Sequence, residues 1–263
     1  MISSTFVRSV CRNFRPSKCR PVAYNLVQRS FRPLRFTQFR SFSSEVEESD
    51  AFNAEEYEDD DDEETEDRTQ IGALAPKFSC TGVFNGEVSV FESEMFRGRW
   101  LVLFFYPLNF TFVCPTEILE FSEKTKEFSA IDCDLLGASV DSQYSHLQVM
   151  KIPRKEGGLG GPMKFPILAD LGGEVADSFN ALNVAGTHSV RATYIIDPEG
   201  KLRHMSFNDP PVGRNVDELL RLVKGYQYAD EHGEVCPVGW QPGDATIKPD
   251  FEEKLEYFET KDK

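Results

Sequence analysis

Short, continuous apolar runs mark the expected strands of this sequence. The run WLVLFFYP (100–107) contains no charged position, as expected of a strand that is covered on both faces. CDLLGASVD (133–141) and ATYIID (192–197) have a similar texture. The turn PEGK (198–201) then leads into LRHMSF, which predicts a hairpin. These runs predict a mixed sheet of mostly buried strands.

Two segments repeat apolar residues at helical spacing instead. They are PTEILEFSEKTKEF (115–128) and GRNVDELLRLVKGYQYA (213–229), and each places its apolar side chains along one face. Buried strands that alternate with helices, together with one hairpin, predict an α/β fold with a central mixed β-sheet flanked by helices. No apolar run approaches the roughly 20 residues that cross a bilayer, so we expect no membrane association.

The first 44 residues carry eight Arg, one Lys and no acidic residue. This composition is typical of an organelle transit peptide, and Arg40-Ser41-Phe42-Ser43 resembles a mitochondrial processing site that is cut after Phe42. We therefore expect residues 1–42 to be a leader that directs the protein to the mitochondrial matrix. A plastid leader and a basic arm that binds RNA or lipid are the alternatives.

An acidic segment follows the expected leader. Residues 45–67 contain 15 Asp and Glu and no basic residue, which predicts a disordered linker over residues 43–70. A tether for a basic partner is the alternative. The rest of the chain has 20 basic and 29 acidic residues, a balance that gives no electrostatic footprint for nucleic acid.

The cysteines are scattered singly along the chain. They are Cys11, Cys19, Cys80, Cys114, Cys133 and Cys236. None belongs to a C-x-x-C pair, and the spacing fits neither a zinc site nor a small disulfide scaffold. This use of cysteine is typical of a reducing compartment, where one or two thiols can be reactive.

Cys114 occupies a special corner, because an apolar strand ends before it and the expected helix begins at Pro115. The free N–H groups and the positive dipole end of a helix stabilise a thiolate. A helix end contributes only about 0.3–1 kcal/mol, or ~2 kcal/mol when partly buried, so a cation is also needed. Arg191, directly before ATYIID, is the candidate. The alternative is that Cys114 is a small buried hydrophobic residue.

The segment FFYPLNFTFVCPTEI (104–118) resembles the active-site signature of typical two-cysteine peroxiredoxins, which are thioredoxin-dependent peroxidases. Six further motifs match in order: VDSQYSHL, RKEGGLG, IIDPEG, NDPPVGRNVDE, HGEVCP and YF (257–258). The chain thus resembles an organelle-targeted member of that family. The resemblance implies a thioredoxin-like fold over residues 71–235 and a C-terminal arm over residues 236–263.

The resemblance also implies the roles of individual residues. Cys114 would be the peroxidatic cysteine, which hydrogen peroxide or an organic hydroperoxide oxidises to a sulfenic acid. Pro107, Thr111 and Arg191 would complete its pocket and stabilise charge on the leaving oxygen. Glu117 and Arg214 would orient Arg191.

Cys236 would be the resolving cysteine, which attacks the sulfenic acid of the other subunit in a homodimer. A thioredoxin-type reductant would reopen the intersubunit disulfide, and dimers would assemble into a decamer. The resemblance implies no metal, haem or flavin. A redox relay or a holdase chaperone that uses the same cysteine is the alternative function. A general disulfide oxidoreductase is disfavoured, because such enzymes use C-x-x-C.

Two further motifs resemble elements that cover the active-site helix in peroxide-sensitive members. They are the GGLG motif (Gly157, Gly158, Leu159 and Gly160) and the pair Tyr257 and Phe258. Their presence predicts sensitivity to overoxidation, in which the sulfenic acid meets a second peroxide and becomes a sulfinic acid. We expect Cys133 to pack in the core and Cys80 to be a partly buried bystander.

Overall fold

The computed structural model describes residues 69–261. The expected leader, residues 1–42, and residues 43–68 of the expected linker lie outside the described residues. The strands are β1 (Ser79–Phe84), β2 (Glu87–Glu92), β3 (Trp100–Phe105), β4 (Cys133–Ser139), β5 (Ile167–Ala169), β6 (Arg191–Ile196) and β7 (Leu202–Asn208). The helices are α1 (Cys114–Ser129), α2 (Gln143–Lys151), α3 (Glu174–Ser178), α4 (Val216–His232) and α5 (Lys254–Lys261), with 3-10 helices η1 (Ser93–Phe96) and η2 (Arg154–Glu156).

The seven strands form one mixed sheet in the order β2-β1-β5-β4-β3-β6-β7. β3, β4 and β5 run parallel, and the outer strands on both sides are antiparallel to their neighbours. The predicted α/β fold with a mixed sheet is therefore confirmed. The strands expected at β3, β4, β6 and β7 and the helices expected at α1 and α4 are all present.

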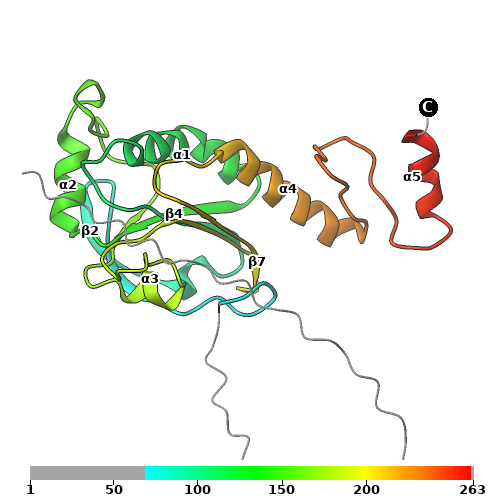
Figure 1. Ribbon diagram of the computed structural model, residues 1–263, viewed down its shortest axis with the longest axis horizontal. Helices are drawn as coiled ribbons and strands as arrows, with labels where there is room; N and C mark the ends of the chain where they lie inside the picture. Colours follow the sequence, from blue (N-terminus) through cyan, green and yellow to red (C-terminus); the bar gives the residue numbers. More distant parts are fainter. Residues whose placement is uncertain (1–68, 262–263) are drawn as a thin grey trace, which may run out of the picture. The chain divides into compact units, whose positions relative to one another are not determined.

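Side chains alternate between the two faces of the sheet, as the pleat requires. Val102 and Phe104 of β3 pack in the core on one face with residues of α1, α2 and α4, whereas Leu103 and Phe105 pack on the other face with residues around α3. Figure 1 shows α1 and α3 on opposite sides of the sheet. Cys133 is 1% exposed in the first core, so the prediction of a core residue is confirmed.

The expectation of a single hairpin was wrong, because β1 and β2 form a second one. Its turn is Asn85-Gly86, and both residues have positive φ (52° and 82°). Asn-Gly is the preferred pair for a two-residue hairpin turn, so the signal was present in the sequence. The apolar pattern does not mark these strands, because Val88 and Val90 of β2 are 46% and 56% exposed while Gly82 of β1 is buried.

The antiparallel pairing of β3 with β6 determines where the predicted site residues meet. Phe104 near the end of β3 lies opposite Thr193 near the start of β6. The C-terminal end of β3 and the N-terminal end of β6, at Arg191, therefore lie side by side at one end of the strands. The loop that leaves β3 and the first turn of α1 follow at that end. We call this loop, residues 106–113, the active-site loop.

The C-terminal arm begins just after α4, whose C-cap Gly233 has a φ of 69°. Trp240 of the arm is 2% exposed, and its ring lies 5.2 Å from that of Tyr228 on α4. An isolated bridge pairs Val235 with Ile247, and α5 follows. Within residues 69–261, no helix has the length and apolar character needed to span a membrane.

Candidate active site at the start of helix α1

Cys114 is the first residue of α1 and its side chain is buried, with 1% of its surface exposed. Pro115 follows in the first turn, where its missing N–H costs nothing. Val113 precedes the helix without a capping side chain. The sulfur therefore stands at the positive end of a sixteen-residue helix that no side-chain acceptor neutralises at its N-cap.

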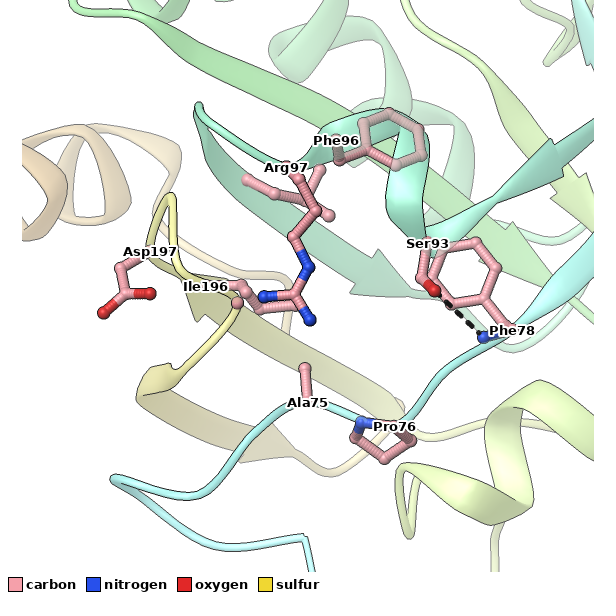
Figure 2. A pocket seen from close by; sticks show the side chains of 10 residues that line it. Ala75, Pro76, Phe78, Ser93, Phe96, Arg97, Ile196 and Asp197 are labelled. Carbon is pink, nitrogen blue, oxygen red and sulfur yellow. Dashed lines mark hydrogen bonds between the residues drawn. The ribbon is translucent and has the colours of Figure 1, made fainter.

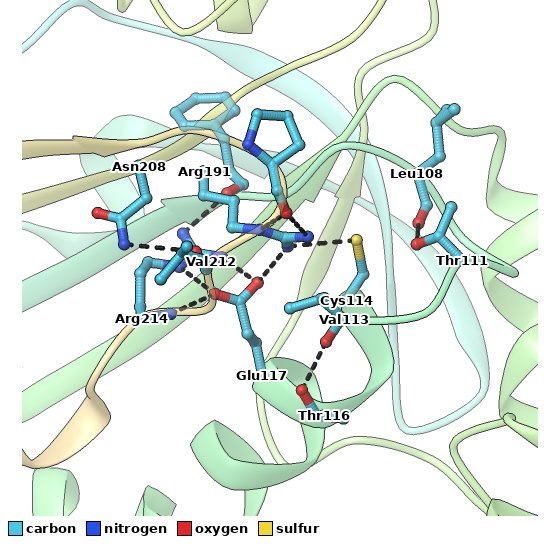
Figure 3. A network of polar contacts seen from close by, with 12 residues as sticks. Leu108, Thr111, Val113, Cys114, Thr116, Glu117, Arg191, Asn208, Val212 and Arg214 are labelled. Carbon is cyan, nitrogen blue, oxygen red and sulfur yellow. Dashed lines mark hydrogen bonds and ion pairs between the residues drawn. The ribbon is translucent and has the colours of Figure 1, made fainter.

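Arg191 supplies the cation that the helix end alone cannot. Its Nη1 lies 3.4 Å from the sulfur of Cys114 and donates to Oε2 of Glu117 at 2.6 Å. Its Nε and Nη2 donate to the carbonyl oxygen of Pro210 at 2.9 and 2.7 Å. With 3% of its side chain exposed, this guanidinium is fixed on three sides and directed at the sulfur (Figure 3).

Glu117, one turn into α1, lies between two arginines. Arg214 donates to Oε1 from its backbone N and its Nε, both at 2.8 Å, and to Oε2 from Nη2 at 3.0 Å. Burial acts to raise the pKa of Glu117, but the hydrogen bonds and charge of Arg214, with the charge of Arg191, hold it below its ordinary value. The carboxylate is thus ionised and orients both guanidinium groups.

Arg214 also ties the site to the sheet. Its Nη1 donates to the carbonyl oxygens of Phe105, the last residue of β3, and of Ala192 in β6, at 2.8 and 2.9 Å. Its guanidinium lies over the ring of Phe104, 5.2 Å from the centroid. The structure therefore brings Cys114 and Arg191 together with the expected supporting pair, Glu117 and Arg214.

The active-site loop places the other two expected pocket residues. Pro107 is buried at the start of the loop, and Thr111 is half-buried. The hydroxyl of Thr111 donates to the carbonyl oxygen of Leu108 at 2.9 Å. In the view of Figure 3, the sulfur of Cys114 lies between Arg191 and Thr111.

Cys236, the expected resolving cysteine, is partly buried beside α4. Its thiol is 3.6 Å from the carbonyl oxygen of Gly225, and a cleft of about 400 Å³ beside it is lined by Arg221, Tyr226 and Val238 among others. Burial raises the pKa of Cys236, and the charge of Arg221 opposes that effect. Cys114 and Cys236 are both free thiols. Cys114 contacts Arg191, whereas Cys236 contacts Gly225, so the two sulfurs share no hydrogen-bond partner.

The GGLG motif packs against the end of α2. Leu159 is 1% exposed in the core, and a Cβ on Gly158 would lie 2.2 Å from the carbonyl oxygen of Ile152. Arg154, at the start of this loop, donates to Glu123 of α1 at 2.8 Å. The GGLG motif is thus linked to the helix that begins with Cys114. Tyr257 and Phe258 lie in α5, with their rings 5.5 Å apart.

No sequence motif pointed to two further parts of the site. The backbone carbonyl oxygen of Pro210 accepts two hydrogen bonds from Arg191. Because every residue has a backbone carbonyl, the sequence cannot identify this role. A buried histidine, His146, contacts Asn109 of the active-site loop. Cys80 is partly buried, as expected, and burial, with the charges of Asp170 and Glu174, raises its pKa to about 11.

A small cavity lies away from these residues, between β1, η1 and the β6–β7 turn (Figure 2). It measures about 30 Å³, enough for only about one or two water molecules. Phe78, Phe96, Arg97 and Ile196 contribute to its lining, and no cysteine or histidine does. Within residues 69–261, no group of three or more Cys, His, Asp or Glu is arranged to hold a metal ion.

The chain matches two protein families. Residues 71–205 match the family described as AhpC/TSA family, and residues 225–261 match the C-terminal domain of 1-Cys peroxiredoxin. The first match contains Cys114 and Arg191, and the second contains Cys236.

Individual relatives agree with these matches. Peroxiredoxin-2 of Mus musculus is 50% identical over 189 residues, which are 72% of this chain and 95% of the relative. Peroxiredoxin-4 of Rattus norvegicus is 47% identical over 192 residues, or 73% of this chain and 70% of the relative.

Solved structures show the same fold. The reduced 2-Cys peroxiredoxin of Plasmodium vivax has a TM-score of 0.70 at 36% identity and covers 72% of this chain and 98% of its own. The mitochondrial 2-Cys peroxiredoxin of Plasmodium falciparum has a TM-score of 0.61 at 39% identity and covers 64% of this chain and 100% of its own. With a buried thiol facing an arginine at the start of a helix, this thioredoxin-like chain belongs to the peroxiredoxins and is a thiol peroxidase.

Proposed function

We propose that Cys114 is the peroxidatic cysteine, acting on hydrogen peroxide and small organic hydroperoxides. Its thiolate attacks one peroxide oxygen, an S–O bond forms, and the O–O bond breaks. The other oxygen leaves and takes up a proton as water or an alcohol, and Cys114 becomes a sulfenic acid. The observation that carries this proposal is the position of Arg191, whose Nη1 lies 3.4 Å from the buried sulfur.

Arg191 and Thr111 would act on the peroxide itself. Arg191 is held by Glu117 and Pro210, so its charge is already in place when negative charge develops on the leaving oxygen. Thr111 would rotate its hydroxyl from Leu108 toward the bound peroxide. Pro107 would shield the pocket from water. Selectivity for peroxides would come from these contacts, because nucleophilicity alone does not distinguish a peroxide from other electrophiles.

Cys236 of a partner subunit would then resolve the sulfenic acid. Its thiol sulfur attacks the sulfur of Cys114, a disulfide forms, and the sulfenic oxygen leaves as water. A thioredoxin-type dithiol would reduce that disulfide and restore both thiols. Because Cys114 is 1% exposed, the first turn of α1 would have to unwind before the two sulfurs could meet.

Two surfaces support assembly into dimers and decamers. β7 is an edge strand of the sheet, so a second copy can extend the sheet there. The active-site loop exposes apolar side chains, with Phe110 54% and Phe112 96% exposed. Large apolar side chains that cluster on a surface mark an interface. We propose the homodimer as the catalytic unit and the decamer as its assembly.

The basic leader would direct the protein to the mitochondrial matrix. The support is the composition of residues 1–44, with nine basic residues and no acidic one, and the processing-like tetrapeptide that ends at Ser43. Expressing a fluorescent fusion of residues 1–44 and sequencing the mature N-terminus test this directly. A plastid signal or an uncleaved N-terminus would contradict it.

The decisive test of the catalytic cycle uses one equivalent of hydrogen peroxide on wild type, Cys114→Ser and Cys236→Ser. Non-reducing gels and intact mass measure the products. We expect a covalent dimer from wild type only, and a gain of one oxygen on Cys114 in Cys236→Ser. A wild type that stays monomeric and gains one oxygen on Cys114 would exclude Cys236 as the resolving residue. An unmodified Cys114 would overturn the peroxidatic role.

The same variants separate the alternative function from the peroxidase cycle. A holdase or redox relay would protect or oxidise a bound client protein. Measuring client aggregation and client thiol oxidation with Cys114→Ser shows whether such activity needs the same sulfur.

A further inference from the structure

Ser189, just before β6, carries a buried hydroxyl that has no hydrogen-bond partner in the protein. The residue is 0% exposed, and its Oγ is the one buried side-chain nitrogen or oxygen within residues 69–261 that makes no hydrogen bond. Buried hydroxyl groups are normally paired, because an unpaired one has lost its hydrogen bonds to water without replacement. The hydroxyl of Ser189 is therefore free to bind a small molecule that enters the protein at this point.

The alternation of side chains along β6 shows which face of the sheet Ser189 occupies. Four alternate residues pack in the core around α3: Val190, Ala192, Tyr194 and Ile196. Arg191 and Ile195 face the other way, Arg191 toward the sulfur of Cys114 and Ile195 into the core that contains residues of α1. An isolated bridge to Leu182 shows that the chain is still extended at Ser189. Because the side chains of an extended chain alternate, Ser189 lies on the same face as Arg191.

The pairing of β3 with β6 shows how far along the strands Ser189 lies. Phe104 is opposite Thr193, and the same antiparallel register, continued along both chains, brings Ser189 level with Leu108 of the active-site loop. The carbonyl oxygen of Leu108 accepts from the hydroxyl of Thr111 at 2.9 Å. Ser189 therefore lies at the end of the strands where the active-site loop begins, on the face of the sheet that carries the cysteine sulfur.

Hydrogen peroxide and organic hydroperoxides differ in the group that such a hydroxyl would meet. Hydrogen peroxide has a proton on each oxygen, whereas an organic hydroperoxide has carbon on the oxygen that leaves. The guanidinium of Arg191 can only donate hydrogen bonds, so it cannot accept from that second O–H. A serine hydroxyl can accept from it, and can rotate to donate when the same oxygen becomes negatively charged. Ser189 thus has the chemistry to favour hydrogen peroxide.

We propose that Ser189 is a specificity-determining residue, whose hydroxyl binds the leaving oxygen of hydrogen peroxide and favours this substrate over organic hydroperoxides. This inference rests on the proposed role of Cys114. The thiolate attacks one oxygen, the S–O bond forms and the O–O bond breaks, and the other oxygen takes up a proton and leaves as water. Ser189 pairs with that second oxygen throughout. In an organic hydroperoxide an alkyl group occupies this place, and the hydroxyl of Ser189 stays unpaired.

Ser189→Ala removes the hydroxyl and adds no volume. The measurement is the second-order rate constant for oxidation of Cys114 by hydrogen peroxide and by tert-butyl hydroperoxide, by quenched flow and intact mass. We expect the ratio of the first constant to the second to fall by about tenfold, the effect of losing one hydrogen bond to a group that becomes charged. The constant for tert-butyl hydroperoxide should stay nearly the same. An unchanged ratio would overturn the proposal, and so would an equal loss with both peroxides, because a packing defect slows both alike.

Thermal unfolding gives a second readout, which does not depend on activity. Ser189→Ala should raise the Tm, because it removes a buried hydroxyl that has no partner. Ser122→Ala is the matched control, since Ser122 is 4% exposed but its hydroxyl accepts from the backbone N–H of Lys164 at 3.4 Å. The control should lower the Tm and leave the ratio of rate constants unchanged.

Two further outcomes would overturn the inference. A lower Tm in Ser189→Ala would show that the hydroxyl already has a partner in the resting protein. A ratio of rate constants that fell equally in Ser122→Ala would show that loss of any buried serine hydroxyl has this effect. A wild type whose Cys114 reacts with neither peroxide would instead reject the proposed function.

Discussion

The Nη1 nitrogen of Arg191 contacts the sulfur of Cys114 at 3.4 Å and the carboxylate of Glu117 at 2.6 Å. One guanidinium nitrogen thus contacts both the cysteine sulfur and the carboxylate that orients the guanidinium. A lysine at this position could supply a charge but not the fork that binds Glu117 and Pro210 together. Charge and orientation at this site come from the same side chain.

Arg191→Lys should therefore lower the rate constant for peroxide by about 10²-fold, in the range that loss of one preorganised donor costs. The rate of Cys114 oxidation under single-turnover conditions measures the effect. Arg203→Lys is the matched control, because Arg203 pairs with Asp230 at 2.7 Å and lies over Trp100, the first residue of β3, at the opposite end of that strand. Equal losses in both variants would contradict the role of Arg191.

Glu117→Gln should destabilise the fold by about 3–5 kcal/mol, because it leaves two buried arginines without their carboxylate. The pKa of Glu117 is lowered below 4.5 in the folded protein. Its stabilising contribution is therefore complete above that ordinary value and is lost as pH falls through the folded pKa. Urea unfolding from pH 7 to pH 3 should show a smaller loss of stability at acidic pH in the variant than in wild type.

The control for that experiment is Glu123→Gln. Glu123 pairs with Arg154, but both side chains are 55% exposed, so the change should cost less than about 1 kcal/mol. If the free energy of unfolding fell equally steeply with acidic pH in wild type and in Glu117→Gln, the pH effect could not be assigned to Glu117.

The glycine inside α4 and the glycine at its C-cap should respond oppositely to alanine. Gly225 lies inside the helix, and an added Cβ would meet its nearest neighbours at ordinary contact distances of 3.9 Å or more. Gly225→Ala should stabilise the protein by about 0.5–1 kcal/mol, since glycine is a poor helix former. Gly233→Ala should destabilise it, because the φ of 69° at this C-cap disfavours a side chain. Calorimetry that shows two shifts of the same sign would contradict this reading of α4.

Replacing Tyr257 and Phe258 with alanine should lower the fraction of Cys114 that becomes a sulfinic acid at a fixed excess of peroxide. If α5 covers the helix that begins with Cys114, weakening that cover lets the disulfide form sooner. Intact mass after repeated turnover measures the sulfinic product. Phe251→Ala, which removes an aromatic ring that is 85% exposed before α5, should leave the fraction unchanged. An unaltered fraction in the double variant would remove α5 from the explanation.

The parts of the fold that could be predicted are those whose own residues carry the pattern. β3 and α1 are long enough for their apolar spacing to identify them, and Pro115 marks where the helix begins. β5 has only three residues, Ile167–Ala169, and so short a segment has no period to detect. β1 and β2 carried a clear turn signal in Asn85-Gly86, which the apolar pattern alone did not reveal.

The site was predictable only as far as topology or resemblance could place distant residues together. Arg191 lies 77 positions from Cys114, and the two meet because β6 is antiparallel to β3 and begins where β3 ends. The contact between His146 of α2 and Asn109 of the active-site loop could not be predicted, because it depends on how the helix packs against the loop. Pro210 contributes a backbone atom, and every residue type has one.

Arg214 joins the last backbone carbonyl of β3 to a carbonyl of β6 and to the carboxylate at the active site. The ends of β3 and β6 and the candidate active site thus share one buried cation. Protection of the amides of Phe105 and Thr193 from hydrogen exchange should therefore fall together when the site loosens. Exchange at these strand ends offers a way to detect the proposed unwinding of the first turn of α1 without a probe on the cysteine itself.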